Sequence, residues 1–244
     1  RGLGSRKPIG FRQWVVHKTA NMGGNTALAG GALNAVDEGS EEALAREGSV
    51  DFHYQQTYEG GDKQGDPELV RKLVDEAYDG VEWLMDLGME FQPGLFTVTG
   101  GMWERAHKPV EPEGSGFFKT YQAYMDKNEG ITMKYETTAK HLIVEDGAVV
   151  GVECEGKTGN KVTVKANNGV VLATGGFGRN IEMREKYNEE TKLWPTLDET
   201  IPSTNTTAIT GDGIVMAEKI GAELVQMGNI QLLPLGDPQT GSLS

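Results

Sequence analysis

Three glycine-rich segments contain the residues whose types and spacing best suit them to binding a ligand. They read GGNTALAGGALNA over residues 23–35, VLATGGF over residues 171–177 and TGDG over residues 210–213. Glycine allows the backbone to approach a ligand closely, and N–H groups at the start of a helix bind phosphate. Threonine and aspartate in these segments can bond to hydroxyl groups or ring edges. Each segment alone is more often a plain turn, but three in order beside apparent strands favour a binding function.

The other candidates for chemistry are weaker. No two of the four histidines, His17, His53, His107 and His141, lie at metal-ligand spacing, so we predict no metal site. His107, within the sequence RAHKP, has the most suggestive setting, and a solvated loop explains it equally well. His141 is expected to be structural. Cys154 is expected to be inert because the neighbouring glutamates raise the pKa of its thiol.

Other common nucleotide and catalytic motifs do not occur. No G-x-G-x-x-G fingerprint follows an apparent strand, and the sequence contains no P-loop, zinc motif or nucleophile elbow. These motifs therefore identify no catalytic residue.

The elements that must position the glycine-rich segments alternate between helix and strand patterns. Val15 and Val16 indicate the end of a short strand before the first segment. Residues 66–68 (DPE) are typical of a helix start, with an N-cap, a proline and an acid in the first turn. The apolar positions that follow at spacings of three and four predict one buried helix face up to Gly88: Leu69, Val70, Leu73, Val74, Ala77, Val81 and Leu84. A second helix is predicted over residues 117–127.

Strand patterns dominate the second half of the chain. Alternation predicts strands at 131–135 and 161–165, and a hairpin joining 141–144 to 149–153 across the turn at 145–147. The apolar run 170–173 predicts a strand buried on both faces. A helix is expected over 213–221 and an extended segment over 224–233. The fold class is therefore α/β with α+β character, including a small antiparallel β meander.

Composition restricts the class of partner. The 244 residues include 23 Lys or Arg and 36 Asp or Glu, a formal charge of −13, with 37% hydrophobic and 24% charged residues. This is a globular composition, and its acidity argues against nucleic acid and anionic membrane surfaces as partners. No apolar run is long enough for a transmembrane segment. A single cysteine excludes an internal disulfide framework and fits both the cytoplasm and the cell envelope.

The segments, taken in this order, resemble a flavoprotein family. That family comprises fumarate reductases, succinate dehydrogenases, L-aspartate oxidases, urocanate reductases and 3-ketosteroid dehydrogenases. Members of its soluble fumarate/urocanate reductase branch have a lysine followed by GGN(S/T), then ATGGF and TGDG, as this chain does from about Val15 onward. The resemblance implies a Rossmann-like FAD-binding domain. It also implies hydride transfer between flavin and a carbon–carbon double bond of an unsaturated carboxylic acid, with an electron donor of unknown identity.

The resemblance also implies roles for individual residues. Near the FAD pyrophosphate and the inner edge of the isoalloxazine it implies Lys18, Gly23, Gly24, Asn25, Thr26, Ala29, Gly30 and Gly31. It implies adenine contacts through the backbone of Ala139, ribose and pyrophosphate contacts at Thr174, Gly175 and Gly176, and positions near the flavin for Thr210, Gly211 and Asp212.

Two further positions bear on flavin attachment and on substrate. Asn25 stands where relatives with covalent flavin have the attaching histidine, so non-covalent FAD is expected. Gln231 and Leu233 are the candidate substrate residues. Leu233 replaces the histidine of a Q-x-H-P-T segment in dicarboxylate-specific relatives, so a substrate other than fumarate, such as a urocanate-like or cinnamate-like acid, is expected.

The remaining expectations concern extent. His17 stands in place of the ribose-binding glutamate of the relatives. We expect residues 1–244 to be a partial FAD-binding domain that lacks the N-terminal dinucleotide fingerprint and the C-terminal capping domain. The catalytic residues are expected beyond residue 244, so the chain by itself is expected to be inactive. The alternative is a non-catalytic α/β nucleotide-binding module or an inactive fragment.

Overall fold

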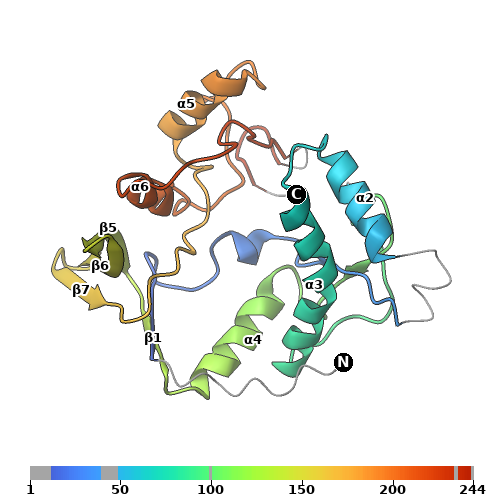
Figure 1. Ribbon diagram of the computed structural model, residues 1–244, viewed down its shortest axis with the longest axis horizontal. Helices are drawn as coiled ribbons and strands as arrows, with labels where there is room; N and C mark the ends of the chain where they lie inside the picture. Colours follow the sequence, from blue (N-terminus) through green and yellow to red (C-terminus); the bar gives the residue numbers. More distant parts are fainter. Residues whose placement is uncertain (1–11, 40–48, 99–100, 234–235, 243–244) are drawn as a thin grey trace. The chain divides into compact units, whose positions relative to one another are not determined.

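The structure, a computed structural model, describes residues 12–39, 49–98, 101–233 and 236–242. The chain divides into two units. Unit 1 combines residues 1–25 with 128–244, and unit 2 is the segment 26–127 between them. Helices and small sheets alternate along the chain, which confirms the α/β class with α+β character (Figure 1).

Unit 1 contains two small sheets. β1 (Gln13–Val16) and β4 (Ile131–Lys134) form a parallel pair in which Val15 lies opposite Met133. The predicted meander follows as an antiparallel sheet in the order β5-β6-β7, over Thr137–Glu145, Ala148–Gly156 and Lys161–Lys165. The short strand ending at Val16 and the strands predicted at 131–135, in the hairpin and at 161–165 are confirmed.

The hairpin between β5 and β6 has a two-residue turn. Glu145 pairs with Ala148, and Asp146 and Gly147 between them have φ of 50° and 80°. Positive φ at both central residues is what a tight hairpin turn needs to match the twist of the strands, and Asp-Gly supplies it at low steric cost. The predicted hairpin is therefore confirmed.

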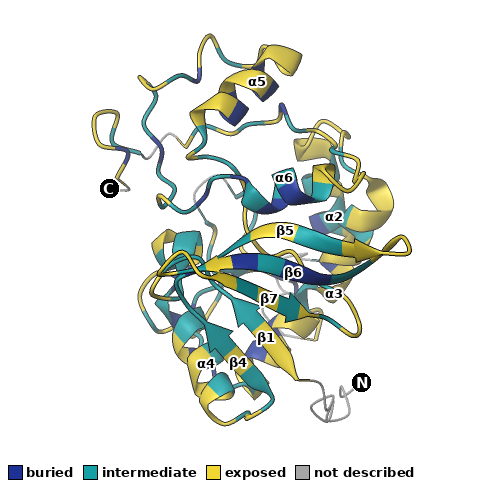
Figure 2. Ribbon diagram, turned by 90° about the vertical axis from the view of Figure 1, so that its left-hand side faces the viewer, coloured by how far each residue is buried: buried dark blue, intermediate teal, exposed yellow. Residues whose placement is uncertain are grey.

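The helices of unit 1 are α5 (Ile181–Thr191) and α6 (Asp212–Glu218). α6 packs against β5, and the meander beneath it is buried mainly along β6 (Figure 2). Cys154 of β6 is 3% exposed, and burial raises the pKa of its thiol. Burial in the sheet therefore explains this cysteine more directly than its glutamate neighbours do.

Two predicted elements of unit 1 are absent from the described residues. Residues 170–173 form no strand, and Val171 is 87% exposed, so the prediction of a strand buried on both faces is wrong. The apolar run is real, but no described strand pairs with it, and a strand requires a hydrogen-bonding neighbour. Residues 224–233 also form no strand, because a turn at 226–228 interrupts them.

Unit 2 is built around two helices, α2 (Val50–Gly60) and α3 (Pro67–Asp86). The predicted start of α3 is confirmed, since Asp66 accepts hydrogen bonds from the backbone N–H groups of Glu68 and Leu69 at 2.8 and 3.2 Å. The remaining elements are α4 (Ser115–Asp126) and the two-residue strands β2 (Leu33–Asn34) and β3 (Ala106–His107); the 3-10 helix η1 (Gly24–Leu28) crosses the boundary with unit 1.

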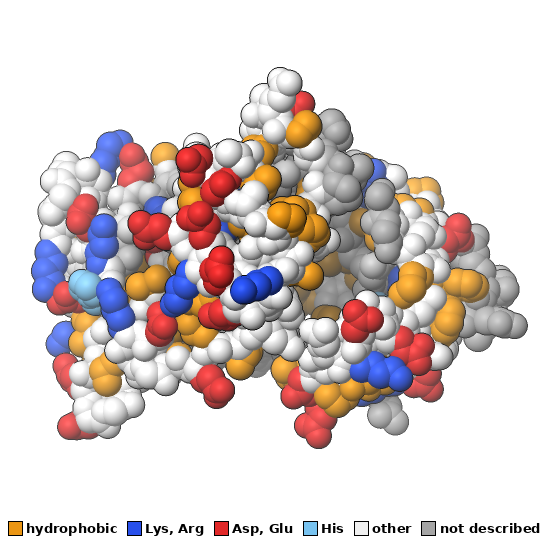
Figure 3. Space-filling model, turned by 90° about the horizontal axis from the view of Figure 1, so that it is seen from above, with side chains coloured by type: hydrophobic (Ala, Val, Ile, Leu, Met, Phe, Trp, Pro, Cys, Tyr) orange, Lys and Arg blue, Asp and Glu red, His pale blue; other side chains and the backbone are white. Residues whose placement is uncertain are grey.

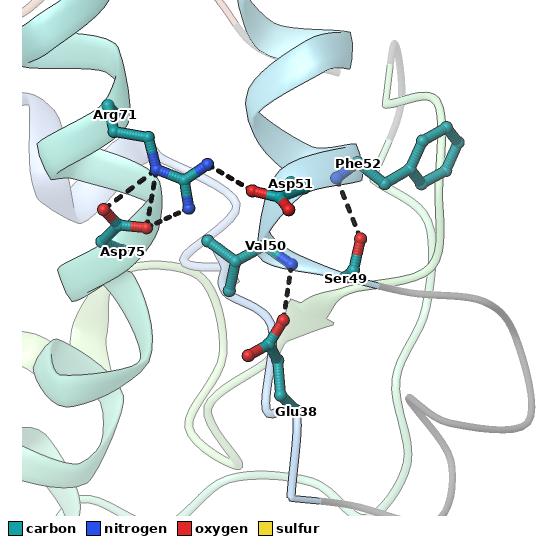
Figure 4. Close-up of polar contacts among 7 residues, drawn as sticks. All are labelled: Glu38, Ser49, Val50, Asp51, Phe52, Arg71 and Asp75. Carbon is teal, nitrogen blue, oxygen red and sulfur yellow. Dashed lines mark hydrogen bonds and ion pairs between the residues drawn. The ribbon is translucent and has the colours of Figure 1, made fainter.

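Only part of the predicted apolar face of α3 is buried. Val74, Val81 and Leu84 are at most 4% exposed, whereas Leu69 and Leu73 are 66% and 62% exposed. The first turns of α3 are instead tied to α2 by charge. Arg71 bonds to Asp75 one turn along α3 and, at 2.6 Å, to Asp51 of α2 (Figure 4). The periodicity identified the helix but not which of its turns are buried against other residues.

The charge on the surface and the lengths of the helices complete the description of the fold. Acidic side chains lie scattered among basic and hydrophobic ones over the face seen in Figure 3. No helix in the described part of the chain combines the length and apolar character that crossing a bilayer requires.

Candidate functional site

Lys18, which precedes the first glycine-rich segment, is joined to the third segment within unit 1. It follows β1, and its ammonium group donates to Thr210 Oγ1 at 2.6 Å, Asp212 Oδ2 at 2.8 Å and the Ala208 carbonyl at 3.0 Å. These three bonds use all three donors of a lysine. Residues 194 positions apart in sequence are thus joined, and we call Lys18, Thr210 and Asp212 the lysine junction.

The lysine junction holds a carboxylate at the start of α6. Burial raises the pKa of Asp212, but hydrogen bonds from Lys18 and Thr210 and the charge of Lys18 outweigh it, so the pKa lies below its usual value. Thr210 accepts from Lys18 and donates to Asp212 Oδ1 at 2.7 Å. Because each side chain of the ion pair is 33% exposed, the pair is partly screened by water.

The second and third glycine-rich segments touch directly. The Gly211 N–H donates to the Gly176 carbonyl at 3.0 Å, and Gly211 has a φ of 83°. A Cβ at Gly213 would lie 2.0 Å from Thr174 Oγ1. Glycine at 211 is therefore required by conformation and glycine at 213 by close packing, both within the protein itself.

Asn25 joins the first segment to a loop that sequence analysis missed. Its side-chain amide donates to Asn205 Oδ1, and its carbonyl oxygen accepts from the Thr206 backbone N–H at 2.9 Å. The same loop fills the space beside Gly178, where a Cβ would lie 2.3 Å from Asn205. The available signal was the run of small polar residues 203–207 (STNTT) just before TGDG.

The second half of the first segment, Thr26 with residues 29–31, belongs to unit 2. Gly31 has a φ of 79°, and a Cβ there would lie 2.1 Å from the Glu113 carbonyl oxygen. A Cβ at Gly114 would lie 1.6 Å from the Thr26 carbonyl oxygen. Packing within unit 2 therefore explains Gly31 without any ligand.

Two glycines of the glycine-rich segments have no explanation among the described residues. At Gly30 and Gly176 a Cβ would meet nothing within 4 Å, and neither residue has a positive φ. Both are exposed. Neither conformation nor packing requires glycine there, and the absent side chain leaves the backbone open to an outside group. Gly24 is also open, but its φ of 49° already favours glycine.

His17 and Ala139 occupy well-defined places in unit 1. His17 Nδ1 lies 3.3 Å from the Thr19 backbone nitrogen and 3.2 Å from Thr19 Oγ1, so this nitrogen is engaged locally. Ala139 lies in β5 opposite Cys154, directly before a shift of register between Ala139 and His141. Such irregularities disturb the regular ladder of backbone hydrogen bonds.

The substrate candidates are exposed, whereas His107 is packed inside unit 2. Gln231 is exposed and Leu233 is 42% exposed, so Leu233 is not a core residue. His107 is not in a solvated loop: it lies in β3, its Nε2 is 3.1 Å from the Ala35 carbonyl oxygen, and its ring packs near Tyr78 and Phe91. The structure therefore gives His107 a packing role in unit 2.

The sequence profile of the family described as "FAD binding domain" matches residues 8–242. A urocanate reductase of Eggerthella lenta is 38% identical over 232 residues, covering 94% of this chain and 37% of the relative. An NADH:acrylate oxidoreductase of Vibrio harveyi is 38% identical over 204 residues, covering 80% of this chain and 20% of the relative. The chain thus spans a minor part of the length of these relatives.

A solved structure has a similar fold. The open conformation of a flavocytochrome c3 fumarate reductase superposes with a TM-score of 0.78 and 31% identity, covering 94% of this chain and 40% of the other. The mixed fold and the converging glycine-rich segments define a nucleotide-cofactor-binding class of protein. The chain belongs to the FAD binding domain family.

The residues present fit FAD. Gly30 and Gly176 expose backbone for which the protein itself has no use, as close approach of a cofactor requires. The lysine junction fixes the start of α6 beside Gly176 through the Gly211–Gly176 hydrogen bond. Lys18, however, is already paired with Asp212, so the junction adds little net positive charge toward a pyrophosphate.

Proposed function

We propose that this chain contributes FAD-binding residues to an oxidoreductase that acts on a carbon–carbon double bond of an unsaturated acid. The observation that carries the proposal lies within unit 1. The third glycine-rich segment bonds to Lys18 and, at Gly211–Gly176, to the second segment, and Asn25 of the first segment bonds to Thr206 just before the third. The reductases of E. lenta and V. harveyi named above support the reaction class. FAD, when bound, supplies hydride transfer.

The chain's own residues bind and orient in this proposal. The residues proposed to bind FAD or to position those that do are Lys18, Gly23, Gly24, Asn25, Thr26, Ala29, Gly30, Gly31, Ala139, Thr174, Gly175, Gly176, Thr210, Gly211 and Asp212. Lys18 acts by holding Thr210 and Asp212 in place, because its three protons already have partners. Gly176 in unit 1 and Gly30 in unit 2 each leave backbone open to close approach by an outside group.

The proposal includes non-covalent attachment. Asn25 presents a carboxamide whose two ends bond to Asn205 and Thr206, and it has no nucleophilic ring nitrogen to form a bond to flavin. Acid precipitation of the full-length protein should leave the flavin in the supernatant. Yellow protein in the pellet contradicts non-covalent attachment.

A matched pair of glycine substitutions tests the binding role directly. Gly176 and Gly80, the latter in α3, both have open space where a Cβ would point and no positive φ. We expect Gly176→Ala in the full-length protein to weaken FAD binding about tenfold or more with little effect on folding, because the methyl group occupies the cofactor's approach. Gly80→Ala should leave FAD affinity unchanged.

Flavin fluorescence during titration of the apoprotein gives both affinities, and circular dichroism checks the fold. Equal FAD affinity for the two variants and the parent would overturn the assignment of Gly176. Failure of the full-length protein to bind FAD at all favours a non-catalytic domain instead.

The substrate part of the proposal concerns Gln231 and Leu233. Both side chains are exposed and therefore accessible to a ligand. Leucine donates no hydrogen bond, and a site that pairs a buried carboxylate discriminates strongly when a donor is lost. We propose that the full-length enzyme prefers an unsaturated acid with an aromatic or heteroaromatic tail over fumarate. Steady-state kcat/KM values on fumarate, urocanate and cinnamate decide this, and a highest value on fumarate refutes it.

The isolated chain is proposed to be inactive. Catalytic groups contribute only when held around the substrate, and no catalytic acid is assigned within residues 1–244. Reduced viologen with each of the three acids should give no turnover above the rate without protein. Measurable turnover shows that the catalytic residues lie within this chain.

A further inference from the structure

Unit 2 buries an arginine that has no counter-ion among the residues the structure describes. Arg105 precedes β3 and is 6% exposed. Its guanidinium lies 5.9 Å from the ring centroid of Phe52, and one Nη2 proton is donated to the side-chain oxygen of Gln56. Among the described residues, no carboxylate forms an ion pair with Arg105. Within the described ranges, the charge of Arg105 is therefore stabilised only by the neutral amide of Gln56 and the aromatic ring of Phe52.

The surroundings of Arg105 offer further unused donors. Arg105 Nε, Trp103 Nε1 and His53 Nδ1 are buried and have no hydrogen-bond partner in the described part of the chain. Trp103 packs edge-on against Phe52, with ring centroids 5.1 Å apart. His53 is 8% exposed on α2, and burial together with the nearby Arg105 charge lowers its pKa to about 4. We call Arg105, His53, Trp103 and Gln56 the arginine cluster.

The chemistry of the arginine cluster specifies the missing partner. Arginine and tryptophan side chains only donate, and a neutral histidine can present an N–H at either ring nitrogen. A buried unpaired charge is costly, and a buried donor left without an acceptor adds its own desolvation penalty. An acceptor with negative charge supplies what the unpaired Nε of Arg105 lacks, and its charge also acts favourably on the donors near it. Guanidinium and carboxylate match each other best, since two parallel hydrogen bonds form.

We propose that the arginine cluster binds a small carboxylate anion. Because Arg105 and His53 are at most 8% exposed, we choose formate, the smallest carboxylate, as the probe. The site lies wholly in unit 2 and does not depend on the proposed flavin function. Its donors are distinct from every residue proposed above for FAD or substrate.

The test is a formate titration of the chain of residues 1–244, followed by thermal unfolding. Ionic strength is held constant with the bulky sulfonate buffer anion MES, so that screening does not change. We expect the unfolding midpoint to rise saturably with formate, because a ligand that binds only the folded state stabilises it. Arg105→Gln should abolish the rise. Arg71→Gln is the matched control, because Arg71 is partly exposed and already bonded to Asp51 and Asp75.

A second variant keeps the test valid if Arg105→Gln does not fold. Gln56→Glu places a carboxylate on the side chain that already contacts Arg105. We expect this variant to unfold about 4 °C or more above the parent and to lose its response to formate, since the site is then filled from within. A parent that shows no saturable response, or a Gln56→Glu chain that is no more stable and still responds, would falsify the proposal.

Discussion

The lysine junction of unit 1 and the arginine cluster of unit 2 differ in how the positive charge of each is neutralised and exposed to water. Lys18 is a third exposed and has three acceptors, one of them the carboxylate of Asp212. Arg105 is almost fully buried and has one neutral acceptor. The resemblance to the flavoprotein family pointed to Lys18, whose charge is neutralised by Asp212 within the chain. Arg105, for which we propose an external anion, stood out only because the structure buries it.

The largest expected effect concerns acid sensitivity at the arginine cluster. The pKa of His53 is lowered from 6.5 to about 4, so the unfolded chain takes up this proton first as the pH falls. The neutral folded form therefore loses stability between pH 6.5 and about 4, by up to about 3 kcal/mol at about 1.4 kcal/mol per pKa unit. His53→Gln should remove this part of the pH dependence.

Urea unfolding of the parent and of His53→Gln across this pH range measures the difference. His141→Gln, at an exposed histidine of β5, is the control and should keep the parent's profile. If the parent and His53→Gln lose stability in parallel, His53 is not held neutral by the cluster.

A smaller effect is expected where the second and third glycine-rich segments touch in unit 1. Gly213→Ala introduces a Cβ at 2.0 Å from Thr174 Oγ1, so Thr174 or α6 must shift. We expect a loss of about 1–2 kcal/mol in the free energy of unfolding, as for other overpacked sites. Gly221→Ala makes a poor control because of its φ of 93°, whereas Gly176→Ala has open space and should be near neutral for folding. Equal losses for Gly213→Ala and Gly176→Ala contradict the close contact.

The lysine junction should contribute only modestly to the free energy of unfolding, because its ion pair is a third exposed to water. Lys18→Met leaves Asp212 with Thr210 alone, and we expect a loss of about 1 kcal/mol because the pair is partly screened. The folded-state pKa of Asp212 is lowered, so this contribution is present above its unfolded pKa and disappears as the pH falls through the folded value. A double-mutant cycle with Asp212→Asn measures the coupling, and strictly additive losses contradict a direct pair.

The smallest effect has the opposite sign. Gly80 lies inside α3 with open space around a Cβ, so Gly80→Ala should stabilise unit 2 by about 0.5–1 kcal/mol through helix propensity alone. Chemical denaturation of the chain measures it. Destabilisation by this alanine means that a group outside the described contacts approaches α3 at this position.

Local patterns in the sequence determined the elements that depend on neighbours in the chain. The Asp66-Pro67 start of α3 and the Asp146-Gly147 hairpin follow from capping and turn conformation, which act over a few residues. The TGDG motif likewise predicted a helix start, and α6 begins at Asp212. The order of the glycine-rich segments was enough to indicate the family, which the match over residues 8–242 bears out.

Only the tertiary structure decided which partners lie far away in sequence. The apolar run at 170–173 suggested a buried strand, but burial depends on a neighbouring strand, and Val171 is 87% exposed. The bonds of Lys18 to Asp212 and of Asn25 to Asn205 cross about three quarters of the chain, a range that no local pattern encodes. Arg105 and His53 looked like ordinary polar residues until folding removed water from them, because the energy of a charge depends on its surroundings and not on its place in the sequence.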